Sequence, residues 1–481
     1  MEKFFRAKFS DSGTETFGDF RVSLGNKSCN VFAEWTWNGE TLTLTNDRHG
    51  FFPVYYFCDK NEFAVSSSIE KLLEIAGKIE FDENALALFL RLGWLVGDDT
   101  IFKNIRALAP ESVLTWEKGV LKIESKEILA PKTLNISRRE AIETYAELFQ
   151  KAIEKTVPPN KKFIVPLSGG RDSRHITFAL HKANLQPLAC ATILHPPPRA
   201  NEDARIAAKV CESLNLKHIL LEQNRPRAEA EIYKNKKFGY SVYEHAWFLA
   251  LADYVSKNPC VIYDGIAGDV LSAGHFLTDK RLKLFREENF HDLAEDILEA
   301  EGYIPKILTK NLYAIYSRER AVNHLIEELV KYKNHPNPVG AFYFYSRTRR
   351  CIAPVSFSLL GDSVQVVMPY LETEVFDFLS ALPVEMFLNH EFHTETIFFA
   401  FPEFANIPFE EKTAPLVPDT EYFRRFSRDV FKFSRTPRNR QMTNPMFFLS
   451  RFLRASVDKK YSRAVVEYGE QAIHLLQLER I

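Results

Sequence analysis

Short runs of alternating apolar and polar residues fill the first 125 residues, and many of the apolar positions are β-branched or aromatic. This period of two is typical of half-buried strands. The runs are NVFAEWTW (30–37), TLTLTN (41–46), PVYYF (53–57) and SVLTWEKGVLKIE (112–124). Turn dipeptides such as Asn38-Gly39 and Lys118-Gly119 interrupt them. The pattern predicts a mainly β region, with helices near Ser68–Ala76 and Glu83–Leu92.

The pattern changes after the polar stretch SKEILAPKTLN. The next segment, ISRREAIETYAELFQKAIEKTV, has the spacing of an amphipathic helix, and Ser137 with Glu140 forms a capping box at its start. The domain boundary is therefore expected within 124–136, between a first domain of residues 1–125 and a second of residues 135–481.

Apolar strand-like runs alternate with helical patterns in the second part of the chain. The expected strands are KKFIVPL, PLACATIL, KHILLE and PCVIYDG, and the expected helices between them are DSRHITFALHKAN, NEDARIAAKVCESLN and YEHAWFLALADYVSK. This order predicts an α/β domain with a doubly wound parallel sheet. Residues 276–360 and the Arg- and Phe-rich part after Tyr422 are expected to be helical elaborations.

Composition narrows the possible partners. The chain has 481 residues, with 62 Lys and Arg against 63 Asp and Glu, so no net charge favours nucleic acid or an anionic membrane. No apolar run reaches the roughly 20 residues that span a bilayer, and no signal peptide is evident, so a cytoplasmic location is expected. The six cysteines form no CxxC pair, and we expect neither disulfides nor a zinc site.

The stretch PLSGGRDSRH (166–175) follows the first expected strand of the α/β domain. In open α/β sheets, ligands bind outside the carboxyl ends of the strands. Gly169 and Gly170 are expected to adopt positive φ and to leave free N–H groups beside a helix N-terminus, where the hydroxyls of Ser168 and Ser173 add donors. The loop therefore predicts a phosphate site, although an ordinary capped strand-to-helix turn is the alternative.

Carboxylates near this loop point to a cation. Asp172 would repel a phosphate unless Mg²⁺ lay between them, which favours Mg–ATP. A second loop, YDGIAGDVLSAG (263–274), follows a later strand and places Asp269 where it can share the metal. Two carboxylates on one Mg²⁺ would stabilise departing pyrophosphate. The alternative is a glycine-rich loop with a capping aspartate.

The Ser-Gly-Gly-x-Asp-Ser pattern resembles the pyrophosphate loop of ATP pyrophosphatases, and the two loops together resemble the synthetase domain of asparagine synthetases, β-lactam synthetases and lasso-peptide cyclases. Gly265, Asp269 and Gly274 match the second motif of this family, whereas Ala267 stands where it has a glycine. The resemblance implies that ATP and Mg²⁺ are cofactors and that Asp172 and Asp269 are metal-binding and catalytic. It places these residues at ATP: Leu167, Ser168, Gly169, Gly170, Asp172, Ser173, Ile193 and Gly265.

Further segments extend the resemblance. MPYLETEVFDF (368–378) is similar to the family's RVPFLD segment, and Lys412 in FEEKTAP aligns with a family lysine that contacts pyrophosphate, although a surface lysine is the alternative. Gln365 aligns with a glutamate near the incoming amine and cannot act as a general base. Arg171 and Arg174 either bind phosphate or an anionic substrate or face solvent.

The first part of the chain resembles the glutaminase domain of the same family. NDRHGFFPVYYF (46–57) and VSSSIEKLLE (65–74) match its segments, which implies an Ntn-like αββα domain. Glutamine-hydrolysing members carry a cysteine directly after the initiator Met, whereas Glu2 stands here. The domain is therefore expected to fold without hydrolysing glutamine.

These residues together predict an ATP-dependent amide-forming ligase that makes an acyl-adenylate, AMP and pyrophosphate. Its expected partners are a small-molecule or peptide carboxylate and an amine from a source other than glutamine, with no nucleic acid or membrane and with a homodimer possible. The alternatives are a catalytically silent nucleotide-binding scaffold, an ordinary ammonia-dependent asparagine synthetase, and a tRNA-modifying ATP pyrophosphatase. The near-neutral charge and unpaired cysteines oppose the last.

Overall fold

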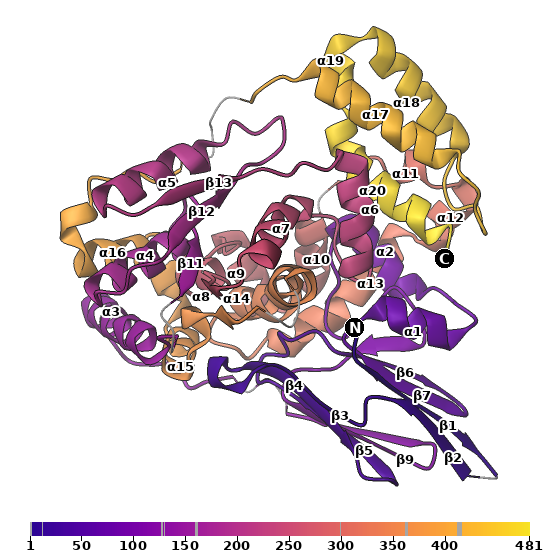
Figure 1. Cartoon of the computed structure of the whole chain (residues 1–481), viewed down its shortest axis with the longest axis horizontal. Helices are drawn as coiled ribbons and strands as arrows, with labels where there is room; N and C mark the ends of the chain where they lie inside the picture. The colour runs from indigo at the N-terminus through magenta and orange to yellow at the C-terminus, as the bar shows by residue number, and fades with distance from the viewer. Residues whose placement is uncertain are drawn as a thin grey trace.

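The computed structural model describes residues 2–11, 13–126, 128, 130–158, 162–298, 300–360, 364–410 and 416–481. Two five-stranded antiparallel sheets form its first part, in the orders β2-β1-β7-β6-β8 and β10-β9-β5-β4-β3. Figure 1 shows both sheets at the indigo end of the chain. Their strands are β1 Phe4–Ser10, β2 Gly13–Gly18, β3 Arg21–Asn26, β4 Val31–Trp37, β5 Thr41–Asn46, β6 Tyr55–Asp59, β7 Glu62–Ser66, β8 Ile105–Ala107, β9 Ser112–Glu117 and β10 Val120–Ser125.

The predicted alternation holds in these sheets. Along β5 every second residue is buried, including Leu42 and Leu44, which are inaccessible to solvent. Helices α1 (Ile69–Ala76) and α2 (Glu83–Leu92) lie where the sequence predicts them, because the side chains of Ser68 and Asp82 cap their first turns. The sequence did not predict β1, β2, β3, β7 and β8.

A parallel sheet forms the centre of the second part, in the order β13-β12-β11-β14-β15. The chain proceeds outward from β11 to β13 and then crosses back to β14, so the sheet is doubly wound as predicted. Its switch point lies between β11 and β14, where ligands bind in such sheets. The strands are β11 Phe163–Pro166, β12 Ala189–Ile193, β13 His218–Leu221, β14 Val261–Tyr263 and β15 Val366–Val367.

Helices cover this sheet and extend beyond it. The longer ones are α3 Arg138–Lys155, α4 Asp172–Lys182, α5 Glu202–Ser213, α6 Arg227–Lys237, α7 Leu249–Lys257, α9 Asp279–Arg286, α10 Phe290–Leu298, α13 Arg318–Leu329, α15 Thr373–Ala381, α16 Phe392–Ala400, α17 Thr420–Ser434, α18 Pro445–Val457 and α20 Val465–Leu478. The short ones are α8 Gly268–Ser272, α11 Ile304–Ile307, α12 Lys310–Ile315, α14 Pro338–Tyr343 and α19 Lys459–Ser462. Two π-helical segments are η4 Phe344–Ile352 and η5 Val355–Leu359, and the 3₁₀ turns are η1 Lys27–Cys29, η2 Ala246–Phe248, η3 Val330–Tyr332, η6 Pro369–Leu371, η7 Val384–Phe387 and η8 Pro402–Phe404.

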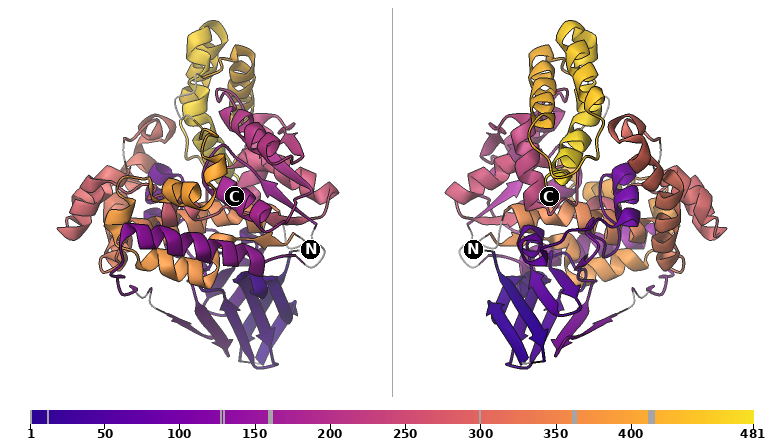
Figure 2. Two further views of the ribbon diagram at one scale, coloured as in Figure 1. Left: turned by 90° about the vertical axis from the view of Figure 1, so that its left-hand side faces the viewer. Right: turned by 90° about the vertical axis from the view of Figure 1, so that its right-hand side faces the viewer.

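The helix boundaries follow local chemistry. The capping box of Ser137 and Glu140 is present at the start of α3, as predicted. The helix expected over 243–257 begins only at η2 and α7, because His245 has a φ of +80° and interrupts the helical path. The sequence did not predict α6. Near the C-terminus, α17 and α18 pack against each other and project from the molecule at the end opposite to the antiparallel sheets (Figures 1 and 2).

Buried arginines of η4 join the two parts of the chain. The Arg349 guanidinium donates to the carbonyls of Gly50 and Leu108, the second at 2.6 Å, and Arg350 donates to the carbonyl of Asp99 at 2.6 Å. Charged donors to carbonyls are stronger than neutral ones, so these contacts hold the β sheets against the helical part. The division into two domains near 125–135 remains a prediction. None of the described helices is long and apolar enough to cross a membrane.

Candidate active site

Two loops meet at the switch point of the parallel sheet, one after β11 and one after β14. A Cβ on Gly268 would lie 2.7 Å from Cγ of Asp172, and a Cβ on Gly265 would lie 2.9 Å from Cβ of the same residue. These two glycines let the second loop run directly against the first residue of α4. The structure therefore brings together the two predicted motifs, which are about a hundred residues apart in the sequence.

The first loop is held by its own hydrogen bonds. The amide of Ser168 donates to Oγ of Ser173 at 3.0 Å, and the amide of Gly170 donates to Oγ of Ser168 at 3.2 Å. The amide of Gly169 donates to Oδ1 of Asp203 at 2.7 Å. The expectation of free N–H groups is therefore wrong for this arrangement, because side chains of the same chain accept from them.

The expectation of positive φ at Gly169 and Gly170 is also wrong, since neither lies in the left-handed region. Space explains the first glycine instead, because a Cβ at Gly169 would lie 2.9 Å from Cβ of Glu410. In the second loop, the left-handed residue that is not a glycine is Ala267, with a φ of +74°. It stands where the second motif has a glycine, and this strain costs about 1 kcal/mol or more.

Two carboxylates face this junction. Asp172 is mostly buried, and burial raises its pKa, with the negative charge of Asp269 raising it further. His393 acts in the opposite direction, with Nδ1 at 3.4 Å from Oδ1 of Asp172. A divalent cation between the carboxylates would offset their repulsion, and oxygen donors are what Mg²⁺ prefers. The residues present therefore fit the predicted Mg²⁺.

A buried cluster of two histidines and a tyrosine packs against Asp172. Nε2 of His393 lies 3.1 Å from Nδ1 of His175 and 3.3 Å from the hydroxyl of Tyr370. The Tyr370 hydroxyl also donates to the carbonyl of Asp172 at 3.1 Å. The sequence did not predict a role for these three residues. His175 ends the loop motif and Tyr370 lies in MPYLETEVFDF, but nothing in the sequence marks His393 on α16 as their partner.

Two protein families match parts of this chain. Residues 16–126 match the family described as glutamine amidotransferase domain, and residues 144–319 match the family described as asparagine synthase. Both loops lie inside the second match. The two matches together support an asparagine synthetase-like family for this chain.

Individual relatives cover only part of this asparagine synthetase-like chain. A protein of Methanocaldococcus jannaschii, named putative asparagine synthetase 2 (glutamine-hydrolyzing), is 26% identical over 147 residues, which cover 29% of this chain. The matched segment spans 28% of that protein's length. The solved NMN synthetase of Francisella tularensis matches with a TM-score of 0.21 and 17% identity, covering 34% of this chain and 75% of its own. A score this low supports no conclusion about either protein.

The two loop arginines of the synthetase domain have defined partners. Arg174 is buried and donates to the carbonyls of Ile407 at 2.9 Å and Pro408 at 2.7 Å, so the solvent-facing alternative is wrong for it. Burial lowers its pKa to about 10. Nε of Arg171 donates to Oγ1 of Thr394 at 2.6 Å. Both arginines therefore attach the loop to the segment after α15, and a role in substrate binding remains a prediction.

Only some of the other predicted residues lie near the two loops. Ile193 is the last residue of β12 and lies at the carboxyl edge of the sheet, where Leu167 directly follows β11. Gln365 precedes β15 and is not brought to the two loops, because its Nε2 lies 3.6 Å from Sγ of Cys29 in the first part of the chain. Lys412 lies outside the residues that the structure describes. In the described part of the chain, none of the six cysteines takes part in a disulfide.

A cavity of about 500 Å³ lies beyond the carboxyl ends of β12 and β13. Segments 194–197 and 222–227 line it together with Trp247, Tyr422 and Arg425. It lies next to Ile193, so it extends the predicted nucleotide site toward the base of the projecting helices. The cavity offers aromatic and cationic side chains to a ligand that carries rings and negative charge.

Proposed function

We propose that this chain is an ATP-dependent ligase that activates a carboxylate as an acyl-adenylate and then transfers the acyl group to an amine. The observation that supports this most is the juxtaposition of Asp172 with the Gly265–Asp269 loop at the switch point. A silent scaffold has no need for a buried carboxylate whose pKa is raised by burial and by the charge of a second carboxylate. The catalytically silent alternative is therefore the weaker one.

Bond changes in the proposed reaction can be assigned to the site. A carboxylate oxygen of the substrate attacks the α-phosphorus of ATP, the bond from that phosphorus to the bridging oxygen breaks, and pyrophosphate leaves. The amine nitrogen then attacks the acyl carbon, loses a proton, and AMP leaves with the electron pair on its phosphate oxygen. When bound by Asp172 and Asp269, Mg²⁺ supplies positive charge to the phosphate oxygens.

The loop side chains hold the leaving group in this proposal. The hydroxyls of Ser168 and Ser173 lie 3.3 Å apart and point to the same place at the start of α4, where helix amides favour an anion. Phosphate oxygens compete with Asp203 for the amide of Gly169. Donors fixed in advance stabilise charge as it develops on pyrophosphate, which is the main source of catalysis in such sites.

The proposed amine is not made from glutamine in this chain. Glu2 lies two residues before the start of β1, and its carboxylate is 3.8 Å from Nζ of Lys237. A carboxylate at this position lacks the thiol that attacks glutamine in hydrolysing relatives. Ammonia or an amine of the substrate itself is therefore the proposed nucleophile, and formation of asparagine from aspartate and ammonia is the simplest such case.

ATP–pyrophosphate exchange tests the proposal. The full chain is incubated with Mg²⁺, ATP, labelled pyrophosphate and one carboxylate at a time from aspartate, β-amino acid derivatives, uronates and short peptides. We expect exchange that depends on one class of carboxylate and no release of glutamate from added glutamine. Binding of an ATP analogue without exchange for any carboxylate would favour the scaffold, and glutamate release would contradict the proposed amine source.

A pH dependence of nucleotide binding follows from two neighbouring acidic residues beside Gly169, Glu410 and Asp203. Burial and the neighbouring Asp203 raise the pKa of Glu410 to about 7. Glu410 is therefore largely neutral at pH 6 and negative at pH 8, where it repels the phosphates. From pH 6 to pH 8, we expect the Kd of ATP to rise about three- to fivefold more for the native chain than for Glu410→Gln. The difference is no larger because solvent screens an exposed charge.

Isothermal titration with a non-hydrolysable ATP analogue measures this effect. The ratio of native to variant Kd at each pH cancels the ionisation of the nucleotide itself. Glu403→Gln, at an exposed glutamate of η8, is the matched control and should follow the native curve. A Glu410→Gln curve parallel to the native one would show that this carboxylate does not face the phosphates.

A further inference from the structure

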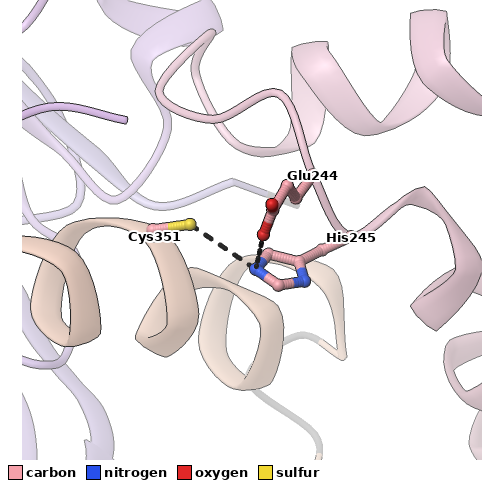
Figure 3. Close-up of side chains that lie close together, drawn as sticks. All are labelled: Glu244, His245 and Cys351. Carbon is pink, nitrogen blue, oxygen red and sulfur yellow. Dashed lines mark hydrogen bonds and ion pairs between the residues drawn. The ribbon is translucent and has the colours of Figure 1, made fainter. Parts of the chain in front are cut away.

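Three potential metal ligands meet away from the two loops, where the segment before η2 contacts the π-helical segment η4. Sγ of Cys351 lies 3.5 Å from Nε2 of His245, and Oε2 of Glu244 lies 3.8 Å from the same nitrogen. Figure 3 shows both side chains converging on this atom. His245 and Cys351 are buried, whereas the Glu244 side chain is 53% exposed.

The convergence on one nitrogen distinguishes this cluster from a catalytic thiol. A nucleophilic cysteine with a histidine base has the acid on the other ring nitrogen, where it orients the imidazole. Here, Nδ1 of His245 is buried without a hydrogen-bond partner among the described residues. Burial also raises the pKa of Cys351 to about 12, which keeps the thiol protonated without a cation.

The spacing fits a bound metal ion. A tetrahedral metal with a nitrogen at about 2.1 Å and a thiolate sulfur at about 2.3 Å separates these atoms by roughly 3.6 Å. The observed separation is 3.5 Å, and a small rotation of the exposed Glu244 brings its oxygen to the same centre. We propose that Glu244, His245 and Cys351 bind a divalent transition-metal ion such as Zn²⁺.

The ligand types select the metal class. Thiolate and imidazole favour zinc or a similar ion over the hard cations Mg²⁺ and Ca²⁺. Three protein ligands with an exposed carboxylate on one side leave a fourth position for water, as in open zinc sites. This centre is therefore separate from the predicted Mg²⁺ of Asp172 and Asp269, and it does not depend on the proposed ligase function.

The backbone conformation and the charged residues around the three ligands are consistent with a metal-binding site. His245 holds a left-handed φ of +80°, and Cys351 lies on a π-helix, and both features concentrate at functional sites. Nη2 of Arg347 lies 3.5 Å from the same Glu244 oxygen and can orient that carboxylate, while the buried Lys234 also contributes positive charge. The two anionic ligands balance the charge of the divalent ion.

The site would stabilise one wall of the cavity beyond β12 and β13. Ala246 and Trp247 follow His245 directly and line that cavity, whereas Cys351 belongs to the segment that also carries Arg349 and Arg350. A metal ion would tie the cavity wall to the segment that joins the two parts of the chain. The absence of CxxC pairs suggested no zinc site, because that pattern detects only ligands that are neighbours in sequence.

Metal binding to the full chain tests the inference. After chelator treatment and dialysis against micromolar Zn²⁺, we expect about one bound equivalent by elemental analysis for the native chain. Co²⁺ should give the intense visible bands of a tetrahedral site and a thiolate charge-transfer band. Glu244→Gln should weaken Zn²⁺ binding by about tenfold or more, and Cys351→Ser should remove the charge-transfer band.

Matched controls separate this site from adventitious binding. Glu222→Gln changes another exposed glutamate at the cavity, and Cys211→Ser changes another buried thiol, and both should bind Zn²⁺ like the native chain. Equal affinity in Glu244→Gln, or a Co²⁺ spectrum without a thiolate band in the native chain, would overturn the inference. If circular dichroism shows that Cys351→Ser does not fold, the Zn²⁺ affinity of Glu244→Gln and the Co²⁺ spectrum of the native chain still test the inference.

Discussion

Replacing Asp172 by asparagine is expected to lower ATP–pyrophosphate exchange by about a hundredfold or more, because removing one preorganised electrostatic group commonly costs this much. The substitution keeps the size of the side chain and its place at the start of α4. It removes the negative charge that faces Asp269 and His393, and with it a ligand of the predicted Mg²⁺. Exchange is measured at saturating carboxylate over a range of Mg²⁺ concentrations.

The matched control is Asp253→Asn, which changes a half-exposed aspartate of α7 that pairs with Arg225. This control should exchange at the native rate. Circular dichroism and thermal unfolding establish whether each variant folds. If Asp172→Asn retains exchange within a few fold of the native rate while remaining folded, Asp172 does not hold the metal, and the proposed site is wrong.

The alternation of apolar strands and amphipathic helices was sufficient to predict the doubly wound sheet, because a buried parallel strand and a crossover helix differ in period. The same alternation predicted β4, β5 and β9 in the first part. It missed β7, whose five residues EFAVS are almost all buried and show no period of two. Short strands that are buried on both faces have no alternation to detect.

Glycine spacing predicted that the two loops meet, but the reasons for individual glycines required coordinates. Gly268 is needed because Asp172 lies against it, whereas Ala267 keeps a left-handed backbone without being glycine. The partner of the Gly169 amide, Asp203, lies more than thirty residues away on α5. A glycine motif indicates that another group packs closely against the backbone. Only the fold shows which residue that group belongs to.

Buried charge was the feature that the sequence predicted least well. An arginine after a loop is usually solvated, yet Arg174 is buried against Phe409, with its guanidinium carbon 4.0 Å from the ring centroid. His393 and His245 are likewise buried histidines with no motif around them. Apart from Glu244, their partners come from distant segments, so the chemistry of these clusters depends on tertiary packing that sequence spacing does not encode.

Gly268→Ala is expected to reduce exchange by about ten- to a hundredfold through geometry alone. The new Cβ would lie 2.7 Å from Cγ of Asp172 and 2.8 Å from Cζ of Tyr370, both far inside van der Waals contact. Because Tyr370 is buried and packed, the carboxylate of Asp172 is the group that must move. A displacement near 1 Å at a catalytic group can cost about a hundredfold in rate.

Whether Gly268→Ala raises or lowers the melting temperature shows whether the new side chain clashes with Asp172. Gly268 is the first residue of α8 and does not have a left-handed backbone, so alanine there would stabilise the protein by about 0.4–1 kcal/mol if the space were free. The clash predicts a lower melting temperature instead. The adjacent Ala267→Gly relieves a left-handed alanine and should raise stability while leaving exchange near the native rate. A Gly268→Ala variant that is both more stable and fully active would mean that the second loop does not pack against Asp172, and the proposed metal site would then lose its geometric basis.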